Sequence, residues 1–341
     1  MAKRRLELTR TQLLGFRRRT GALDERLPSG PSSLRAAAWA GLQDSMPRAA
    51  LLSIHARVEG TEPTSWEDPS LVQLWGPRFS AFVVAERDRA VFTLGRLPDD
   101  PSARRHAEQL AVRLDTFLDG RRMKFGEAGH ALCTNPNALR YAAPTGRVLM
   151  RWDGARQPTI WTVPPPAMDP GEARLELARR YLHVFGSATA GAFAEWAGIA
   201  PASGRATFDA LAGSLTPTRT PVGDGWILTD DEAAFRTPAQ PGSTTARLVP
   251  SGDTYFLLQG ADRELLVPDP DQRQQLWTPR VWPGAVLIDG EVVGTWRRAA
   301  GVVRIQAWHR LSPTARDAIE AEAQAFPLPD VGGRIRVRWE P

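Results

Sequence analysis

Gln43, Asp44 and Ser45 interrupt an alanine-rich run that resumes at Pro47, in the stretch WAGLQDSMPRAA. An amide, a carboxylate and a hydroxyl in succession can orient a water molecule and supply negative charge, as hydrolytic chemistry requires. The same residues can cap a helix that begins near Pro47, because the first turn of a helix has N–H groups without intrahelical partners. Two interpretations therefore stay open: a cap alone, or a cap that is also a site.

The sequence lacks the motifs of several other chemistries. It contains no P-loop or GxGxxG nucleotide-binding motif, no HExxH motif of zinc proteases, no GxSxG nucleophile elbow of hydrolases and no EF-hand calcium-binding loop. The five histidines lie far apart, and Cys133 is the only cysteine, so a disulfide within the chain is impossible. We therefore expect no metal, no cofactor and a reducing compartment.

Length, charge and hydropathy limit the number of domains, the kind of partner and the location of the protein. At 341 residues the chain exceeds one ordinary core, which predicts two or three domains. Its formal net charge of +5 permits a polyanionic partner. Neither a run of 18 apolar residues nor the apolar core of a signal peptide occurs. We expect a cytoplasmic monomer that does not contact a membrane.

A recurring order of three helices and a hairpin positions the polar residues. One copy has helices at 102–118, 125–132 and 135–141 and a tight hairpin at Asp153-Gly154. The next has helices at 172–185, 190–197 and 203–211 and strands that flank Gly223-Asp224-Gly225. A looser first copy has helices at 8–19, 34–42 and 48–58 and a hairpin turn at Gly76-Pro77, so Gln43 to Ser45 lie between its second and third helices. Three helices followed by a β-ribbon are typical of a winged helix.

The predicted fold class follows from this order. The chain is expected to be mainly α with β-hairpin wings, as three tandem winged helix-turn-helix units at residues 1–98, 99–166 and 167–240. After residue 244 the pattern changes to strands, with a helix at 313–325 and an edge strand in RIRVRWEP. This change predicts a β-rich α+β domain at residues 241–341.

Several arginines are placed to bind DNA phosphates. Arg140 lies on a predicted third helix, and Arg151 and Arg156 lie on the hairpin that follows it. Arg78 belongs to the first hairpin, and Arg48 follows the Gln-Asp-Ser stretch. Phosphate affinity requires charge on one surface rather than in the total, so these five residues predict double-stranded DNA as the partner.

With these units in view, the chain resembles the AlkZ-like family of winged-helix DNA glycosylases from about Leu8 to Phe326. The segments that carry the resemblance are GLQDSMPRAALLSIHARV, ARRYLHVFGSATAGAFAEWAGI, RLVPSGDTYFLLQG and VLIDGEVVGTWRR. The resemblance implies a concave surface that holds duplex DNA and excision of alkylated bases, including cross-linked ones. The family's catalytic motif is Gln, a hydrophobic residue, then Gln or Asp. Gln43 matches it, whereas Asp44 and Ser45 depart from it.

The departures shape the expected mechanism. Hydrolysis of an N-glycosidic bond passes through an oxocarbenium-like sugar and needs a positioned water, and Ser45 cannot take a proton from that water at neutral pH. We therefore expect Asp44, rather than Ser45, to carry most of the rate. The substrate expected is a cationic alkylated purine, which leaves without acid catalysis.

Other functions stay open on the sequence alone. A catalytically silent DNA-binding protein, such as a lesion sensor or regulator, would show the same units and arginines. An interaction protein could use winged helices as a scaffold, and a metal-dependent nuclease would need a carboxylate cluster that the sequence lacks.

Overall fold

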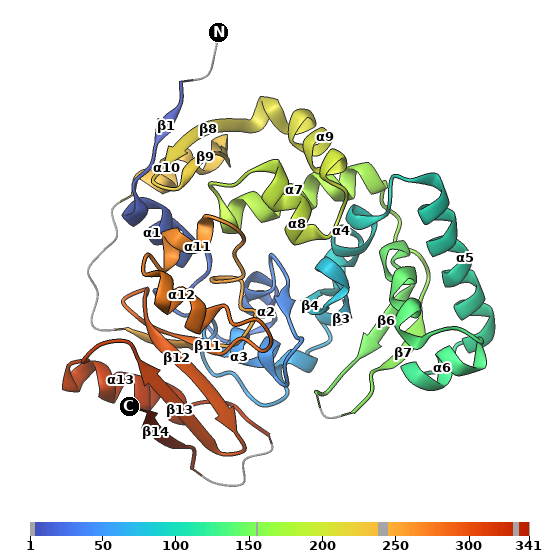
Figure 1. The fold of residues 1–341 in the computed structure, drawn as a ribbon. Helices are drawn as coiled ribbons and strands as arrows, with labels where there is room; N and C mark the ends of the chain where they lie inside the picture. The colour runs from blue at the N-terminus through green and yellow to red at the C-terminus, as the bar shows by residue number, and fades with distance from the viewer. Residues whose placement is uncertain (1–3, 155, 238–244, 330–333, 341) are drawn as a thin grey trace.

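The computed structural model describes residues 4–154, 156–237, 245–329 and 334–340. It has a mixed α+β fold, in which helices alternate with small sheets and a larger sheet follows at the C-terminal end (Figure 1). Within the described ranges, no helix is long and apolar enough to cross a membrane.

The first segment combines a three-stranded sheet with several short helices. Its elements are β1 (Leu6–Glu7), α1 (Arg10–Thr20), α2 (Pro31–Ala37), β2 (Leu42–Gln43), α3 (Ala49–His55), η1 (Ser65–Glu67), β3 (Leu71–Trp75), η2 (Pro77–Phe79), β4 (Ala81–Ala85), η3 (Glu86–Asp88), α4 (Arg89–Thr93) and η4 (Leu94–Arg96). The strand order is β2-β4-β3, and the turn that joins β3 to β4 contains the expected Gly76-Pro77.

Helix α1 starts at a capping box, in which the side chains of Thr9 and Gln12 bond each other's backbone N–H groups. It packs against helices of the third segment, and β1 pairs in parallel with a strand there. The N-terminal residues therefore pack on the third segment of the chain.

The second segment carries the longest helix. Its elements are α5 (Pro101–Leu118), β5 (Met123–Lys124), α6 (Phe125–Ala131), η5 (Pro136–Thr145), β6 (Val148–Arg151) and β7 (Thr159–Thr162). The helix expected at 135–141 is η5, which Asn135 caps and Pro136 begins, but η5 is a 3₁₀ helix rather than an α-helix. Pro144 lies inside it, and proline has no N–H group for an α-helical bond.

The hairpin of the second segment lies where it was expected but is not tight. Its outermost pair is Arg151 with Thr159, so the two strands are joined by more residues than the two of an Asp-Gly turn. Gly154 has a φ of 83°. A Cβ atom there would lie 2.7 Å from the Cα atom of Pro47, so Gly154 packs closely on the residues that follow the Gln-Asp-Ser segment.

The third segment consists of α7 (Pro170–Phe185), α8 (Ala190–Ala197), α9 (Pro201–Leu211), η6 (Ala212–Ser214), β8 (Leu215–Thr220), β9 (Gly223–Leu228), η7 (Thr229–Asp231) and α10 (Glu232–Arg236). The expected turn at Gly223-Asp224-Gly225 is wrong, because Thr220 pairs with Gly223 and the turn is Pro221-Val222. Gly225 instead allows a close approach within the sheet, since a Cβ atom there would collide with the Ser187 hydroxyl.

The C-terminal part is built on a five-stranded sheet of order β10-β11-β12-β13-β14. Its elements are β10 (Ala246–Val249), α11 (Asp262–Leu266), α12 (Pro270–Leu276), β11 (Gly284–Ile288), β12 (Glu291–Ala299), β13 (Val302–Ala307), α13 (Pro313–Gln324) and β14 (Arg336–Glu340). The expected edge strand is confirmed as β14, which pairs in parallel with β13. The expected closing helix is confirmed as α13, whose Ile319 and Ala323 pack in a core with Trp296 of β12.

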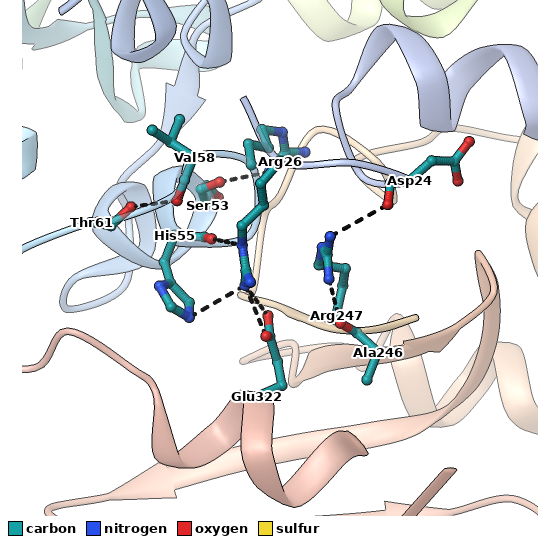
Figure 2. Close-up of polar contacts among 10 residues, drawn as sticks. Asp24, Arg26, Ser53, His55, Val58, Thr61, Ala246, Arg247 and Glu322 are labelled. Atoms are coloured by element: carbon teal, nitrogen blue, oxygen red, sulfur yellow. Dashed lines mark hydrogen bonds and ion pairs between the residues drawn. The ribbon is translucent and has the colours of Figure 1, made fainter. Parts of the chain in front are cut away.

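Part-buried contacts join helix α13 of the C-terminal part to the first segment at the end of α3. Figure 2 shows Arg26 between the carbonyl oxygen of His55, which it bonds at 2.7 Å, and the carboxylate of Glu322 on α13, at 2.7 and 2.8 Å. The His55 ring lies 3.5 Å from the same guanidinium. Burial, with the positive charges of Arg26 and Arg247, lowers the pKa of His55 to about 3. This junction therefore contains a neutral histidine beside two arginines.

Candidate functional site

The Gln-Asp-Ser segment leaves the sheet at the end of β2. Gln43 pairs with Phe82 of β4, and the N–H group of Asp44 donates to the carbonyl of Ala81 at 2.7 Å. Gly41 precedes the strand with a φ of 74°, and a Cβ atom there would lie 2.9 Å from the ring of Phe92. Glycine at this position lets the chain turn tightly into β2.

Asp44 lies inside the protein, with 3% of its surface exposed. Its Oδ1 atom accepts the N–H group of Ala50 in the first turn of α3 at 2.9 Å, and its Oδ2 atom accepts Nε2 of Gln73 at 2.6 Å. Burial raises the pKa of Asp44 to about 6, against the opposing effects of those bonds and of the charges of Arg48 and Arg151. Asp44 thus satisfies the helix start, as one sequence interpretation required, and holds a negative charge below the surface at neutral pH.

Gln43 and Ser45 lie on the other side of the backbone. Ser45 is exposed and Gln43 is half-buried. The Gln43 amide donates to Ser45 Oγ at 3.2 Å and accepts from Nη2 of Arg78 at 3.3 Å. A Cβ atom on Gly252 would lie 3.0 Å from Nε2 of Gln43, so glycine at that position leaves space for the amide. The amide is therefore oriented from two sides at the border of the solvent.

Arg78 connects Gln43 to the third and C-terminal segments. With its carbonyl toward Arg78, Gln259 accepts from Nη1 of Arg78 at 2.7 Å and donates to Glu195 of α8 at 3.1 Å. Burial lowers the pKa of Arg78. Arg78 and Phe79 both have a positive φ, 53° and 56°, a conformation that costs energy in residues other than glycine and is concentrated at functional sites.

Two more of the predicted arginines gather beside Asp44. The guanidinium groups of Arg48 and Arg151 lie 5.4 and 3.9 Å from the ring centre of the buried Trp66, at distances typical of cation–π contacts. Arg151 also forms an ion pair with Glu67 at 2.5 Å. Both charges lower the pKa of Asp44. The structure thus places Arg48, Arg78 and Arg151 around the Gln-Asp-Ser segment.

The remaining two predicted arginines lie apart from Asp44. Arg140 lies on η5 and donates to the carbonyl of Asn137 at 2.9 Å. Arg156 is exposed in the loop between β6 and β7, where its N–H group donates to the carboxylate of Asp153 at 3.2 Å. Neither residue contacts Gln43, Asp44 or Ser45 through a hydrogen bond or ion pair among the described residues.

Sequence reasoning missed Gln73, which joins Asp44 to the second hairpin. Its Nε2 atom donates to Asp44, and its Oε1 atom accepts the N–H group of Trp152 at 2.5 Å. The side chain is 3% exposed. The available signal was an amide inside the otherwise apolar strand LVQLW, because a buried polar group needs a partner.

The loop at residues 250–259 was quoted for the family resemblance without assigned roles. Asp253 in this loop is 1% exposed and forms a two-pronged ion pair with Arg57, with both distances at 2.7 Å. Gly252 lies against Gln43 and Gln259 bonds Arg78. One loop of the C-terminal part therefore anchors Arg57, two residues after α3, and also supports the Gln43 amide.

A family model and a solved structure are similar to this chain. The family model described as DNA glycosylase AlkZ-like matches residues 36–327. Among solved structures, the Streptomyces sahachiroi DNA glycosylase AlkZ is similar, with a TM-score of 0.77 and 18% identity over 98% of this chain and 100% of that chain. At this identity the structural likeness shows a shared fold. A search of curated protein sequences found no match.

Proposed function

The chain belongs to the AlkZ-like family of DNA glycosylases, and on this premise we propose that it hydrolyses the N-glycosidic bond of an alkylated base in double-stranded DNA. The observation that carries the proposal is the placement of Gln43, the residue that matches the family's motif. Its amide is held by Ser45 and Arg78 beside exposed surface. The family match favours this activity over a catalytically silent DNA-binding protein.

The proposed chemistry needs little acid catalysis. The Gln43 amide and the Ser45 hydroxyl hold a water molecule that adds to C1′ while the bond from C1′ to N9 breaks. The electron pair of that bond goes to the purine, whose positive charge after N7 alkylation is neutralised, and the water proton leaves to solvent. The buried charge of Asp44 stabilises the oxocarbenium-like sugar from below, in a region where low polarity strengthens electrostatic effects.

Duplex DNA is the proposed partner of a monomer. The three segments that end in hairpins would be winged-helix units at residues 1–98, 99–166 and 167–240, followed by the domain at 241–341. Arg48, Arg78 and Arg151 would contact phosphates near the damaged nucleotide, and Arg140 and Arg156 would contact the flanking backbone. Support for this arrangement comes from the placement of the first three arginines around the Gln-Asp-Ser segment.

A strand-cleavage assay tests the proposal. Duplex DNA that contains one 7-methylguanine should acquire an abasic site, detected as an alkali-labile break, when it is incubated with the protein. Gln43→Ala should lose most of this activity and keep its affinity for the duplex. Because Gln43 is half-buried beside a glycine, the shorter side chain should leave the fold intact. Equal cleavage by both proteins would contradict the proposed role of Gln43.

A further inference from the structure

A cavity of about 290 Å³ lies between α8, the β8–β9 hairpin and the loop that follows Leu258. Thr189, Glu195, Gln259 and Asp262 supply polar groups to its wall. Its volume is just below the roughly 300–1,000 Å³ of drug-sized small-molecule sites. The cavity is therefore of a size suited to a single small group such as a nucleobase.

The wall of this cavity is connected to the catalytic amide proposed above. Gln259, which lines the cavity, accepts a hydrogen bond from Arg78, and Arg78 donates to Gln43 at 3.3 Å. One continuous series of hydrogen bonds thus runs from Gln43 to the cavity. The cavity wall therefore contacts the residue that orients the proposed catalytic amide.

The charge of the wall is negative on the side of α8. Glu195 is exposed, accepts a hydrogen bond from Gln259, and forms no ion pair among the residues that the structure describes. Asp262 faces the same cavity and lies 3.6 Å from Arg17. The positive charges of Arg78 and Arg263 act on Glu195, but neither guanidinium forms an ion pair with it among the described residues. Arg78 is bonded to Gln43 and Gln259 instead. The Glu195 carboxylate therefore has capacity to bind a cationic ligand.

We propose that this cavity receives the damaged base after it leaves the helical stack, and that Glu195 selects a purine made cationic by N7 alkylation. This inference rests on the proposed function. Guanine presents N1–H and N2–H donors on its Watson–Crick edge, which N7 alkylation leaves free and which match the two oxygens of a carboxylate. The positive charge of the alkylated ring strengthens both hydrogen bonds. An unmodified guanine has the same donors without that charge, so Glu195 discriminates between them.

The test uses nucleosides, so it does not depend on catalysis. Full-length protein at pH 6 is titrated with 7-methylguanosine and with guanosine up to millimolar concentration, and binding is followed by NMR of the side-chain amide of Gln259. We expect 7-methylguanosine to bind about tenfold more tightly than guanosine. Glu195→Gln, which keeps the shape of an exposed side chain, should abolish this preference. Glu108→Gln, which alters an exposed glutamate on α5, is the matched control and should leave it unchanged.

Two results would overturn the inference: equal affinity of the wild type for both nucleosides, including no detectable binding of either, and an unchanged preference in Glu195→Gln. The outcome is separable from that of the proposed function. If the protein removes 7-methylguanine from duplex DNA but shows no nucleoside preference, the proposed function stands and the proposed role of the cavity is wrong. If the protein prefers 7-methylguanosine but releases no base from DNA, the proposed role of the cavity stands and the proposed function is wrong.

Discussion

Asp44→Asn removes the negative charge below Gln43 and Ser45 and leaves a side chain of the same shape. Both carboxylate oxygens already accept hydrogen bonds, from Ala50 and Gln73, so we expect Asp44 to act through its charge rather than by taking a proton. At roughly 7 Å from the reacting sugar and an effective dielectric constant of about 20, Coulomb's law gives about 2.4 kcal/mol. Excision should therefore fall about 50-fold.

The same substitution should change stability little. With a pKa of about 6 in place of 3.8, the charged form of Asp44 costs the folded state about 3 kcal/mol at pH 7. Asparagine removes that cost, but its Nδ2 group then faces Nε2 of Gln73, and two donors cannot bond each other, which costs about 1–3 kcal/mol. The free energy of unfolding should stay within about 2 kcal/mol of wild type.

A double variant separates the charge from the hydrogen bonds. In Asp44→Asn with Gln73→Glu, the asparagine amide donates to the new carboxylate, whose other oxygen still accepts the N–H group of Trp152. The charge moves by one side chain, so part of the excision rate should return relative to Asp44→Asn alone.

The assay for these variants is single-turnover release of 7-methylguanine, with urea unfolding to monitor the fold. Asp231→Asn, which alters a carboxylate that is 8% exposed and bonds His183 at 2.9 Å, is the matched control and should retain the wild-type rate. If folded Asp44→Asn releases the base at the wild-type rate, the carboxylate is a cap alone and the electrostatic reasoning is refuted.

Four further outcomes are expected. Ser45→Ala should slow excision much less than Gln43→Ala in the same single-turnover assay, because the amide also bonds Arg78; equal losses would argue against this ranking. Arg57→Ala should lower the free energy of unfolding by about 3–5 kcal/mol in urea titrations, because it leaves buried Asp253 without its cation; a loss below 1 kcal/mol would mean that the pair contributes little. Because the pKa of His55 is lowered in the folded state, the unfolded chain binds the proton more readily, and the free energy of unfolding falls as the pH drops below about 6.5. Between pH 7.5 and pH 5, wild type should lose about 2 kcal/mol of this free energy relative to His55→Gln. Parallel pH profiles of the two proteins would contradict the effect of burial on His55. Affinity for duplex DNA, measured by fluorescence anisotropy, should fall roughly 10³- to 10⁵-fold between about 50 and 200 mM salt if six to ten phosphates are contacted, and indifference to salt would exclude binding through arginine.

Local signals in the sequence identified many of the elements. The helix start at residue 135 and the turn at Gly76-Pro77 between β3 and β4 were identified in this way, because caps and tight turns depend on a few adjacent residues. The predicted turn at Gly223-Asp224-Gly225 was wrong because a glycine that is typical of a turn can also serve another purpose. Gly225 permits the close approach of the segment around Ser187, and that need is not visible in the residues next to it.

The candidate site was predictable only in part. Gln43 to Ser45 stood out because polar residues break an apolar run, and their number and type suggested both a cap and a site. The contacts of Asp44 with Gln73 and of Gln43 with Gly252 join segments that are distant in sequence, so no spacing rule reveals them. The inward direction of Asp44 and the outward direction of Ser45 follow from where β2 joins the sheet, which depends on tertiary packing.

Direct identification of the released base tests whether the protein hydrolyses the N-glycosidic bond of an alkylated base in duplex DNA. Duplex DNA with a single 7-methylguanine is incubated with the wild-type protein, and the small-molecule fraction and the DNA are analysed separately by mass spectrometry. We expect free 7-methylguanine and one abasic site for each base released, with no release of unmodified guanine. Tight binding of the duplex without any free base over many hours would contradict it.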